Sequence, residues 1–436
     1  MVASASMDKQ EILLAHREHL FPAVFHYFRE PLVLERAQDQ FVWDADGNQY
    51  LDFFGGIVTI SVGHCNREVS RRVHEQLDRL THVSTVFATE PQAALAQKIA
   101  SLTPGRQLTK CFFTNSGTEA NETAILTARC YTGSDEIIAL RHAYHGRSAL
   151  GMSLTGQDTW RLPGATQPGV VRAHTAYCYR CPFGLAYPEC EVRCARDVED
   201  LIRTSTRGRV AGFIAEPIQG VGGFITPPPE YFRIVAEIVR RHGGLFLCDE
   251  VQTAWGRTGD KWFGIEHWGV TPDIITSAKG LGNGLPIGVT VARPEVADAL
   301  RGVTISTFGG NPVAATAARA VIDFIEGHRL AAKASEMGAY LRARLEELRE
   351  RFPLIGDVRG LGLMCGVELV ADRGSKKPDK ALRDRVTGGC FEAGLILLGC
   401  GENTVRFCPA LVVTRAEIDT GVAIFDRVLT RCEGRR

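Results

Sequence analysis

Apolar and polar positions along the middle of the chain follow two different periods. Short, nearly continuous apolar runs are found at "KCFFTNSG" (110–117), "DEIIALR" (135–141), "RVAGFIAEP" (209–217), "LFLCDEV" (245–251) and "DIITSAKG" (273–280). Between them, "GTEANETAILTARCYTG" (117–133) and "EYFRIVAEIVRRHGG" (230–244) repeat apolar residues with helical spacing. In the second helix, this spacing puts Tyr231, Val235, Ile238 and Val239 on one face. Apolar strands separated by helices predict a mostly parallel sheet that is buried on both faces.

The two ends of the chain have a different pattern. "QFVWDADGNQYLDFF" (40–54) has a D-G turn between aromatic-rich runs, which predicts a hairpin. From about residue 320, long helices such as 333–352 are interleaved with short strands such as "LMCGVELV" and "TVRFCPA". We therefore expect an α/β protein with a large domain at 66–318 and a smaller α+β domain at 319–436, which an N-terminal segment (1–65) joins.

Composition narrows the classes of function. The 436 residues include 50 Lys and Arg and 50 Asp and Glu, so the net charge is zero and gives no support to a nucleic-acid or membrane partner. No apolar run approaches the roughly 18 residues of a spanning helix. The start, "MVASASMDKQEILLAHREHL", resembles neither a secretory signal nor a transit peptide. Thirteen cysteines are too sparse for a disulfide scaffold, so we expect a reducing cytoplasm.

Polar residues follow four of the predicted strands. Glu216, Asp249 and Lys279 each lie at a strand's carboxyl end, and 116–118 both follow a strand and open a helix. Ligands of open α/β sheets bind at the carboxyl ends of the strands. A single charge there would be an ordinary solvated side chain, but two acids, a lysine and an anion-binding helix start on one edge predict a site.

This combination suits pyridoxal phosphate, which needs an amine for a Schiff base, an acid beside its ring nitrogen and a cradle for its phosphate. Lys279 would supply the amine and Asp249 the acid. The helix that starts after Ser116 would bind the phosphate through backbone N–H groups. Gln252 could donate to the phenolic oxygen, and Tyr144 could stack on the ring.

Six motifs then appear in order: "NSGTEANE", "AYHG", "AEPIQGVGG", "CDEVQTAWGRTG", "AKGLGNGLP" and "TFGGNP". Together they resemble the class III pyridoxal-phosphate-dependent aminotransferases over nearly the whole chain. "YLDFFGGIVTISVGHC" and "VRGLGLMCGVEL" look most similar to the alanine–glyoxylate (β-aminoisobutyrate–pyruvate, or ω-transaminase) branch. The resemblance implies fold type I and a homodimer, or a tetramer, with active sites at the subunit interface.

The resemblance also implies roles for individual residues. It makes Lys279 the Schiff-base lysine, Asp249 the partner of the ring nitrogen and Gln252 the donor to the phenolic oxygen. The remaining cofactor-binding residues would be Ser116, Gly117, Thr118, Tyr144, His145, Glu216 and, from the neighbouring subunit, Thr307. The substrate-binding residues would be Arg406, Glu216, Ile57, Val58 and Phe87.

The expected reaction is a ping-pong transfer of an amino group from an amine or a β- or ω-amino acid to a small 2-oxo acid such as pyruvate or glyoxylate. Arg406 would bind the 2-oxo acid's carboxylate, and Glu216 would neutralise Arg406 when a carboxylate-free amine is bound; a static salt bridge between them is the alternative. A lyase on the same fold, which acts on phospho-amines or dialkylglycines, and a γ-aminobutyrate or ornithine aminotransferase stay open. So does a metal-binding or redox protein with a vestigial cofactor site.

Two other motifs resemble known sites but lack a feature that each site requires. "GLGNG" is followed by Pro286 and Gly288, where a dinucleotide-binding loop would begin a helix. The two histidines of "HAYHG" lack a third metal ligand in the motif.

Cys178, Cys181, Cys190 and Cys194 have a C-x2-C…C-x3-C spacing that a structural zinc ion would accept. Disulfides and free thiols are equally open from the sequence. No catalytic metal is expected.

Overall fold

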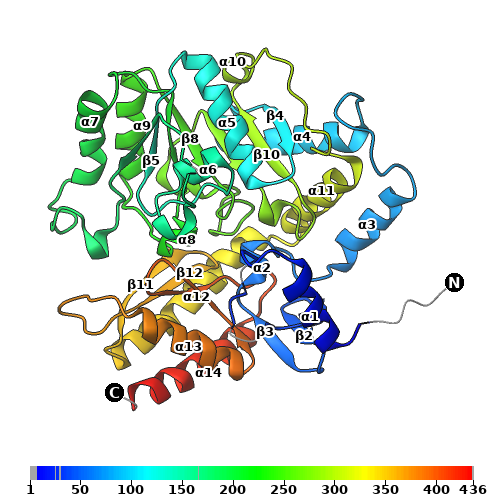
Figure 1. Cartoon of the computed structure of the whole chain (residues 1–436), viewed down its shortest axis with the longest axis vertical. Coiled ribbons are helices and arrows are strands. Elements are labelled where there is room, and N and C mark those ends of the chain that lie inside the picture. Colours follow the sequence, from blue (N-terminus) through cyan, green and yellow to red (C-terminus); the bar gives the residue numbers. More distant parts are fainter. Residues whose placement is uncertain (1–6, 25, 29–30, 165, 435–436) are drawn as a thin grey trace.

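The computed structural model of the chain describes residues 7–24, 26–28, 31–164 and 166–434. A seven-stranded sheet fills the upper half of the molecule in Figure 1, in the order β4-β10-β9-β8-β7-β5-β6. Its strands are β4 (Lys110–Thr114), β5 (Ile137–Leu140), β6 (Val170–Ala173), β7 (Gly212–Ala215), β8 (Leu245–Asp249), β9 (Ile274–Ser277) and β10 (Gly288–Ala292). Strand β10 runs opposite to the other six strands of this sheet and pairs antiparallel with β4 and β9. The prediction of a mostly parallel sheet is therefore confirmed, although β10 itself was not predicted.

Helices lie on both faces of this sheet (Figure 1). They are α4 (Glu90–Leu102), α5 (Gly117–Thr132), α6 (Ala149–Leu154), α7 (Arg193–Ser205), α9 (Tyr231–Arg241), α10 (Pro294–Ala297) and α11 (Pro312–Gly327). The short helix α8 (Gly220–Gly223) instead contacts strands of the lower half. Every residue of β5, β7, β8, β9 and β10 is buried, as two covered faces require. The predicted apolar face of α9 is buried as well. Each large apolar side chain buried in this way contributes about 1.5–3 kcal/mol.

Two smaller sheets form the lower half of the molecule. One is antiparallel, in the order β11-β12-β15-β14: β11 (Ile355–Leu361), β12 (Met364–Leu369), β15 (Thr404–Phe407) and β14 (Leu398–Cys400). The other, β1-β2-β3-β13, joins both ends of the chain: β1 (Leu34–Gln38), β2 (Phe41–Asp44), β3 (Gln49–Asp52) and β13 (Leu395–Ile396). The helices here are α1 (Lys9–His19), α12 (Leu330–Arg351), α13 (Lys380–Glu392) and α14 (Arg415–Glu433). After β3 the chain continues through α2 (Gly55–Val58) to α3 (Arg67–Leu77), which packs against α11.

The predicted hairpin is confirmed as the antiparallel pair β2 and β3. Its turn is held by Asp44, whose Oδ1 accepts hydrogen bonds from the backbone N–H groups of Asp46 (3.0 Å) and Asn48 (2.8 Å). Strand β13, from the C-terminal segment, pairs in parallel with β3. The two ends of the chain thus share a sheet, while the exact domain bounds stay a prediction.

Between the two halves, α2 is a left-handed turn rather than a regular helix. Gly55, Gly56, Ile57 and Val58 all have positive φ, from 55° to 64°. Two consecutive β-branched residues in this region are strained, by about 1–3 kcal/mol each. The turn carries the chain from β3 up to the carboxyl edge of the large sheet (Figure 1). Throughout the ranges given above, no helix combines the length and the apolar character needed to cross a bilayer.

Candidate active site

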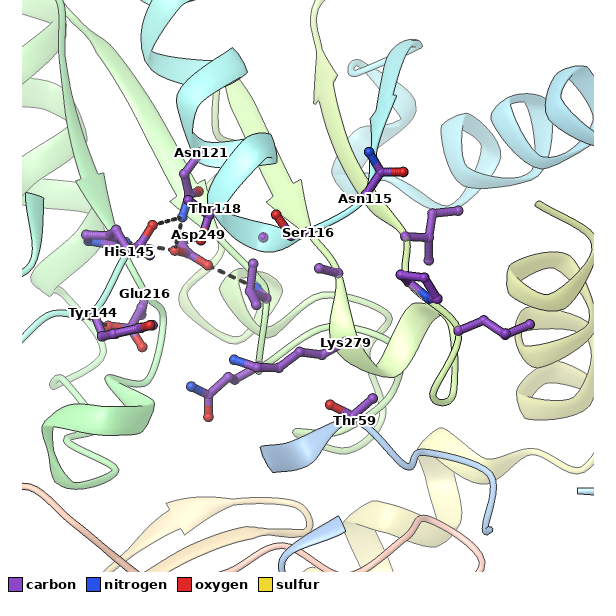
Figure 2. A pocket seen from close by; sticks show the side chains of 18 of the residues that line it. Thr59, Asn115, Ser116, Thr118, Asn121, Tyr144, His145, Glu216, Asp249 and Lys279 are labelled. Carbon is purple, nitrogen blue, oxygen red and sulfur yellow. Dashed lines mark hydrogen bonds and ion pairs between the residues drawn. The ribbon is translucent and has the colours of Figure 1, made fainter. Parts of the chain in front are cut away.

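A cavity of about 310 Å³ opens at the carboxyl ends of β4, β7, β8 and β9. It gathers most of the residues that the sequence singled out (Figure 2): Ser116, Gly117, Thr118, Tyr144, His145, Glu216, Asp249, Gln252 and Lys279. These strands run in the same direction, so their ends meet on one edge as expected.

The start of α5 forms one wall. Ser116 is the N-cap, and its Oγ accepts a hydrogen bond from the Glu119 N–H (3.2 Å). The first N–H groups of a helix have no partner within it, and the helix dipole adds positive charge there. A Cβ on Gly117 would lie 2.9 Å from Val251, and one on Gly146 would lie 2.5 Å from the Thr118 hydroxyl. The wall is therefore a tight backbone cradle for an anion such as a phosphate group.

Asp249, the last residue of β8, is buried and fully oriented. Its Oδ2 is 2.7 Å from both the Asn121 Nδ2 and the His145 Nδ1, and its Oδ1 accepts from the Val251 N–H (3.1 Å). Burial alone would raise the pKa of Asp249, but the hydrogen bonds from His145 and Asn121 hold that pKa below its ordinary value. Asp249 is thus a carboxylate that can keep a nearby ring nitrogen protonated.

Lys279 begins the short 3-10 turn η5 (Lys279–Leu281) after β9, and its φ of 43° lies in the left-handed region. Burial in the cavity lowers the pKa of its amine to about 8, against the opposing effect of the carboxylates of Asp249 and Glu216. The guanidinium of Arg406 favours the neutral amine as well. A lysine whose pKa lies near neutrality can act as a nucleophile and as a base.

Glu216 is also buried, but it does not contact the arginine it was expected to meet. Its Oε1 accepts from the Tyr144 N–H (3.0 Å), and its Oε2 accepts from the Gly220 N–H (2.8 Å). Burial raises the pKa of Glu216 to about 7, and the charge of Asp249 acts in the same direction. Within the described structure, no ion pair joins Glu216 to Arg406, and backbone donors bond to both carboxylate oxygens, so the static salt bridge is not observed. The gate between Glu216 and Arg406 stays a prediction.

Arg406 lies on β15, with a side chain only 8% exposed. Its guanidinium carbon is 5.2 Å from the centre of the Phe54 ring. Within the described chain, its Nε and Nη1 atoms have no hydrogen-bond partner, although both are buried. A buried guanidinium with unpaired nitrogens is costly unless an anion binds it, so Arg406 is suited to a substrate carboxylate.

The residues expected to line the substrate side lie in different surroundings. Val58 belongs to the hydrophobic core and does not line the cavity, whereas the next residue, Thr59, does. Ile57 and Phe87 are 46% and 63% exposed, and Thr307 is also exposed, outside the cavity of its own chain. The resemblance suggested Val58, but the left-handed turn of α2 buries Val58 in the core and places Thr59 at the cavity.

Tyr144 and Gln252 complete the walls. The Tyr144 ring meets Trp160 edge-on, with 5.5 Å between ring centres, and burial raises the pKa of Tyr144. Gln252 is 6% exposed, and its Oε1 is buried without a partner in the described structure.

Sequence reasoning missed Asn121 and Val251, which both line the cavity. Asn121 lies one helical turn after Thr118, and asparagine is a poor helix former, so its position inside α5 was a usable signal.

The four clustered cysteines, Cys178, Cys181, Cys190 and Cys194, all line one small apolar cavity near α7. All thirteen cysteines are free thiols, and burial raises the pKa of Cys194 to about 12. Across the described ranges, no three His, Cys, Asp or Glu side chains are placed to hold a metal ion. The structure therefore supports neither the zinc site nor the disulfides that the sequence left open.

The main cavity has the parts that pyridoxal phosphate requires. An anion cradle lies at α5, a carboxylate at the end of β8, a lysine of lowered pKa after β9 and an unpaired amide at Gln252. These groups fit the phosphate, the ring nitrogen and the aldehyde of that cofactor. A nucleotide or a metal ion would not need an amine of this kind.

Comparisons with known proteins agree with this reading. The family model for class III aminotransferases matches residues 26–429. An Arabidopsis thaliana protein named alanine–glyoxylate aminotransferase 2 homolog 2, mitochondrial, is 41% identical, covering 96% of this chain and 87% of its own. A leucine/methionine racemase from Thermococcus litoralis is 38% identical, covering 98% of this chain and 97% of its own.

Among solved structures, an (S)-enantioselective ω-transaminase from Thermomicrobium roseum has a TM-score of 0.91 and 35% identity, covering 98% of this chain and 100% of its own. An amine transaminase from an uncultivated Pseudomonas species, solved in its pyridoxal-phosphate-bound form, has a TM-score of 0.90 and 31% identity. The match covers 95% of this chain and 99% of the transaminase chain. With the cavity's chemistry, these matches establish that the chain belongs to the class III aminotransferases, pyridoxal-phosphate-dependent enzymes of fold type I.

Proposed function

We propose that this aminotransferase moves an amino group from an amine or a β- or ω-amino acid to a small 2-oxo acid such as pyruvate or glyoxylate. The observation that carries the proposal is Arg406. Its buried guanidinium has two nitrogens without a hydrogen-bond partner in the described structure. The positive charge of Arg406 also helps to lower the pKa of Lys279. A 2-oxo acid has a carboxylate next to its reacting carbonyl, so an arginine close to the lysine would bind the acid in a reactive orientation.

The chain's own residues supply the other steps. Pyridoxal phosphate, when bound, supplies a ring that takes up the electron pair released at the substrate carbon. Asp249 holds the ring nitrogen protonated, and the start of α5 fixes the phosphate. The Lys279 Nζ can take the proton from the substrate carbon and return it at a neighbouring atom, because its lowered pKa makes the neutral amine accessible.

The donor that we propose has an uncharged or apolar end. Ile57 and Phe87 offer apolar surface on the segments that precede and follow α3. Among the described residues, Lys279 is the one lysine or arginine that lines the cavity, and Arg406 acts on Lys279 from outside that lining. A second carboxylate on the donor would therefore lack a cationic partner in this chain, which disfavours γ-aminobutyrate.

We also propose a homodimer. Five exposed apolar side chains come from two segments, before α4 and before α11: Val86, Phe87, Val303, Ile305 and Phe308. Val86 and Ile305 line one groove of about 430 Å³, and the Phe308 ring lies 4.9 Å from His82. An exposed apolar patch of this kind is typical of a subunit interface. Thr307 lies within this patch. If a second copy docked there, Thr307 of one subunit would lie beside the cofactor cavity of the other.

The test is a pair of half-reactions followed by the cofactor's absorbance. L-Alanine, and separately a carboxylate-free amine such as 1-phenylethylamine, should convert the bound cofactor to its amino form, and pyruvate or glyoxylate should restore it. Release of ammonia or phosphate in place of this cycle would indicate a lyase. Formation of D-alanine from L-alanine without any 2-oxo acid would indicate a racemase. Absence of any spectral change would refute the proposed transfer.

A further inference from the structure

Both polar atoms of the Asn121 side-chain amide have hydrogen-bond partners. The side chain is 2% exposed; its Nδ2 donates to the Asp249 Oδ2 (2.7 Å) and to the His145 carbonyl (3.0 Å), and its Oδ1 accepts from the Thr276 hydroxyl (2.6 Å). The carboxylate and the carbonyl can only accept, so both require the NH2 group. The Oδ1 must then face Thr276, whose hydroxyl has to donate. The amide has one possible orientation.

This orientation decides which oxygen of Asp249 is available. Oδ2 receives two donors, from Asn121 and from the His145 ring, and is directed into the protein. Oδ1 receives only the Val251 N–H at 3.1 Å, and Asp249 lines the cavity. Oδ1 is therefore the oxygen left to accept a hydrogen bond from a ligand. Hydrogen bonds to a carboxylate are stronger than neutral ones, so Asn121 also favours the charged form.

Asn121 joins three elements of the site. It lies on α5, one turn after the residues of the anion cradle. Asp249 ends β8 and is the register partner of Thr276 on β9, three residues before Lys279. One side chain thus links the cradle, the acid and the strand that carries the lysine (Figure 2 shows Asn121 beside Asp249).

We propose that Asn121 is a positioning residue for the transfer reaction. Held by Thr276, it keeps the Asp249 carboxylate charged and aimed at the ring nitrogen of the bound cofactor. This inference rests on the cofactor chemistry of the family and not on the identity of the substrates. Its test therefore measures cofactor binding, and the test can succeed or fail independently of the proposed substrates.

The experiment measures the dissociation constant of pyridoxal phosphate from cofactor-free protein by fluorescence titration at pH 5.5 and pH 8. Asn121→Leu removes the amide at similar volume, and Thr276→Val removes only the hydroxyl that orients it. Thr290→Val is the matched control, because its buried hydroxyl also bonds α5, at the Ala120 carbonyl (2.8 Å), without touching Asp249. Using the ratio to wild type cancels the cofactor's own titration.

We expect Asn121→Leu to weaken binding at pH 5.5 by roughly 10- to 100-fold, the effect of a lost hydrogen bond to a charged group. The loss should be smaller at pH 8, where Asp249 is charged even without the amide. Thr276→Val should weaken cofactor binding in the same way but by a smaller factor, and Thr290→Val should bind the cofactor as tightly as wild type. Losses of equal size at both pH values, or in all three variants, would overturn the proposal. If circular dichroism shows that Asn121→Leu does not fold, Thr276→Val against Thr290→Val decides alone.

Discussion

Replacing Arg406 with alanine tests the proposed acceptor most directly. The guanidinium is buried, and its Nε and Nη1 have no partner in the described structure, so it has N–H groups available for charge-assisted hydrogen bonds with a carboxylate. Loss of one member of such a buried pair costs about 2–5 kcal/mol, or roughly 30- to 5,000-fold in kcat/KM. We expect that loss in the half-reactions with pyruvate and alanine. The half-reaction with 1-phenylethylamine, which has no carboxylate, should change far less.

Single-turnover absorbance of each half-reaction is the assay, and Arg383→Ala is the control. Arg383 is also a buried arginine (9% exposed), but its bonds go to Asp384 and to the carbonyls of Gly401 (3.2 Å) and Glu402 (3.0 Å). Loss of the Arg383 side chain should lower the stability of the protein, but it should change the rates of both half-reactions by the same factor. If Arg406→Ala slows both half-reactions by the same factor, as Arg383→Ala would, then Arg406 is structural and the acceptor proposal fails.

Three further predictions concern the lysine and the interface. Lys279→Ala should abolish multiple turnover while the cradle at α5 still binds cofactor, and turnover near the wild-type rate would contradict the assigned role. Because the protonated Lys279 amine cannot attack the cofactor's aldehyde, covalent capture by cofactor-free protein should rise roughly tenfold per pH unit up to about pH 8 and then level off; a rise continuing to pH 10 would refute the lowered pKa. Phe308→Glu should yield monomers in light scattering, whereas Leu185→Glu, at an exposed apolar residue outside the patch, should not; an unchanged mass for Phe308→Glu would place the interface elsewhere.

Much of the fold could be read from the sequence because it depends on local pattern. The run 245–248 is apolar at every position and lies in a fully buried strand, and the spacing in 231–241 became an amphipathic helix. Strand ends follow from the same pattern, so the sequence alone places Asp249 and Lys279 on one edge of the sheet. Strand β10 was missed because its antiparallel direction depends on its neighbours β4 and β9, which lie far apart in sequence.

The sequence by itself determined most of the elements, the cofactor chemistry and the family, because each depends on local spacing and on residue type. Only the tertiary structure decided where the polar groups find their partners. Glu216 bonds to backbone N–H groups and not to Arg406, Thr59 rather than Val58 enters the cavity, and Asn121 reaches Asp249 across 128 positions of sequence. Hydrogen bonds require atoms within about 3 Å and a defined angle, and burial makes an unpaired group costly. Both conditions depend on how distant segments pack, which no local pattern records.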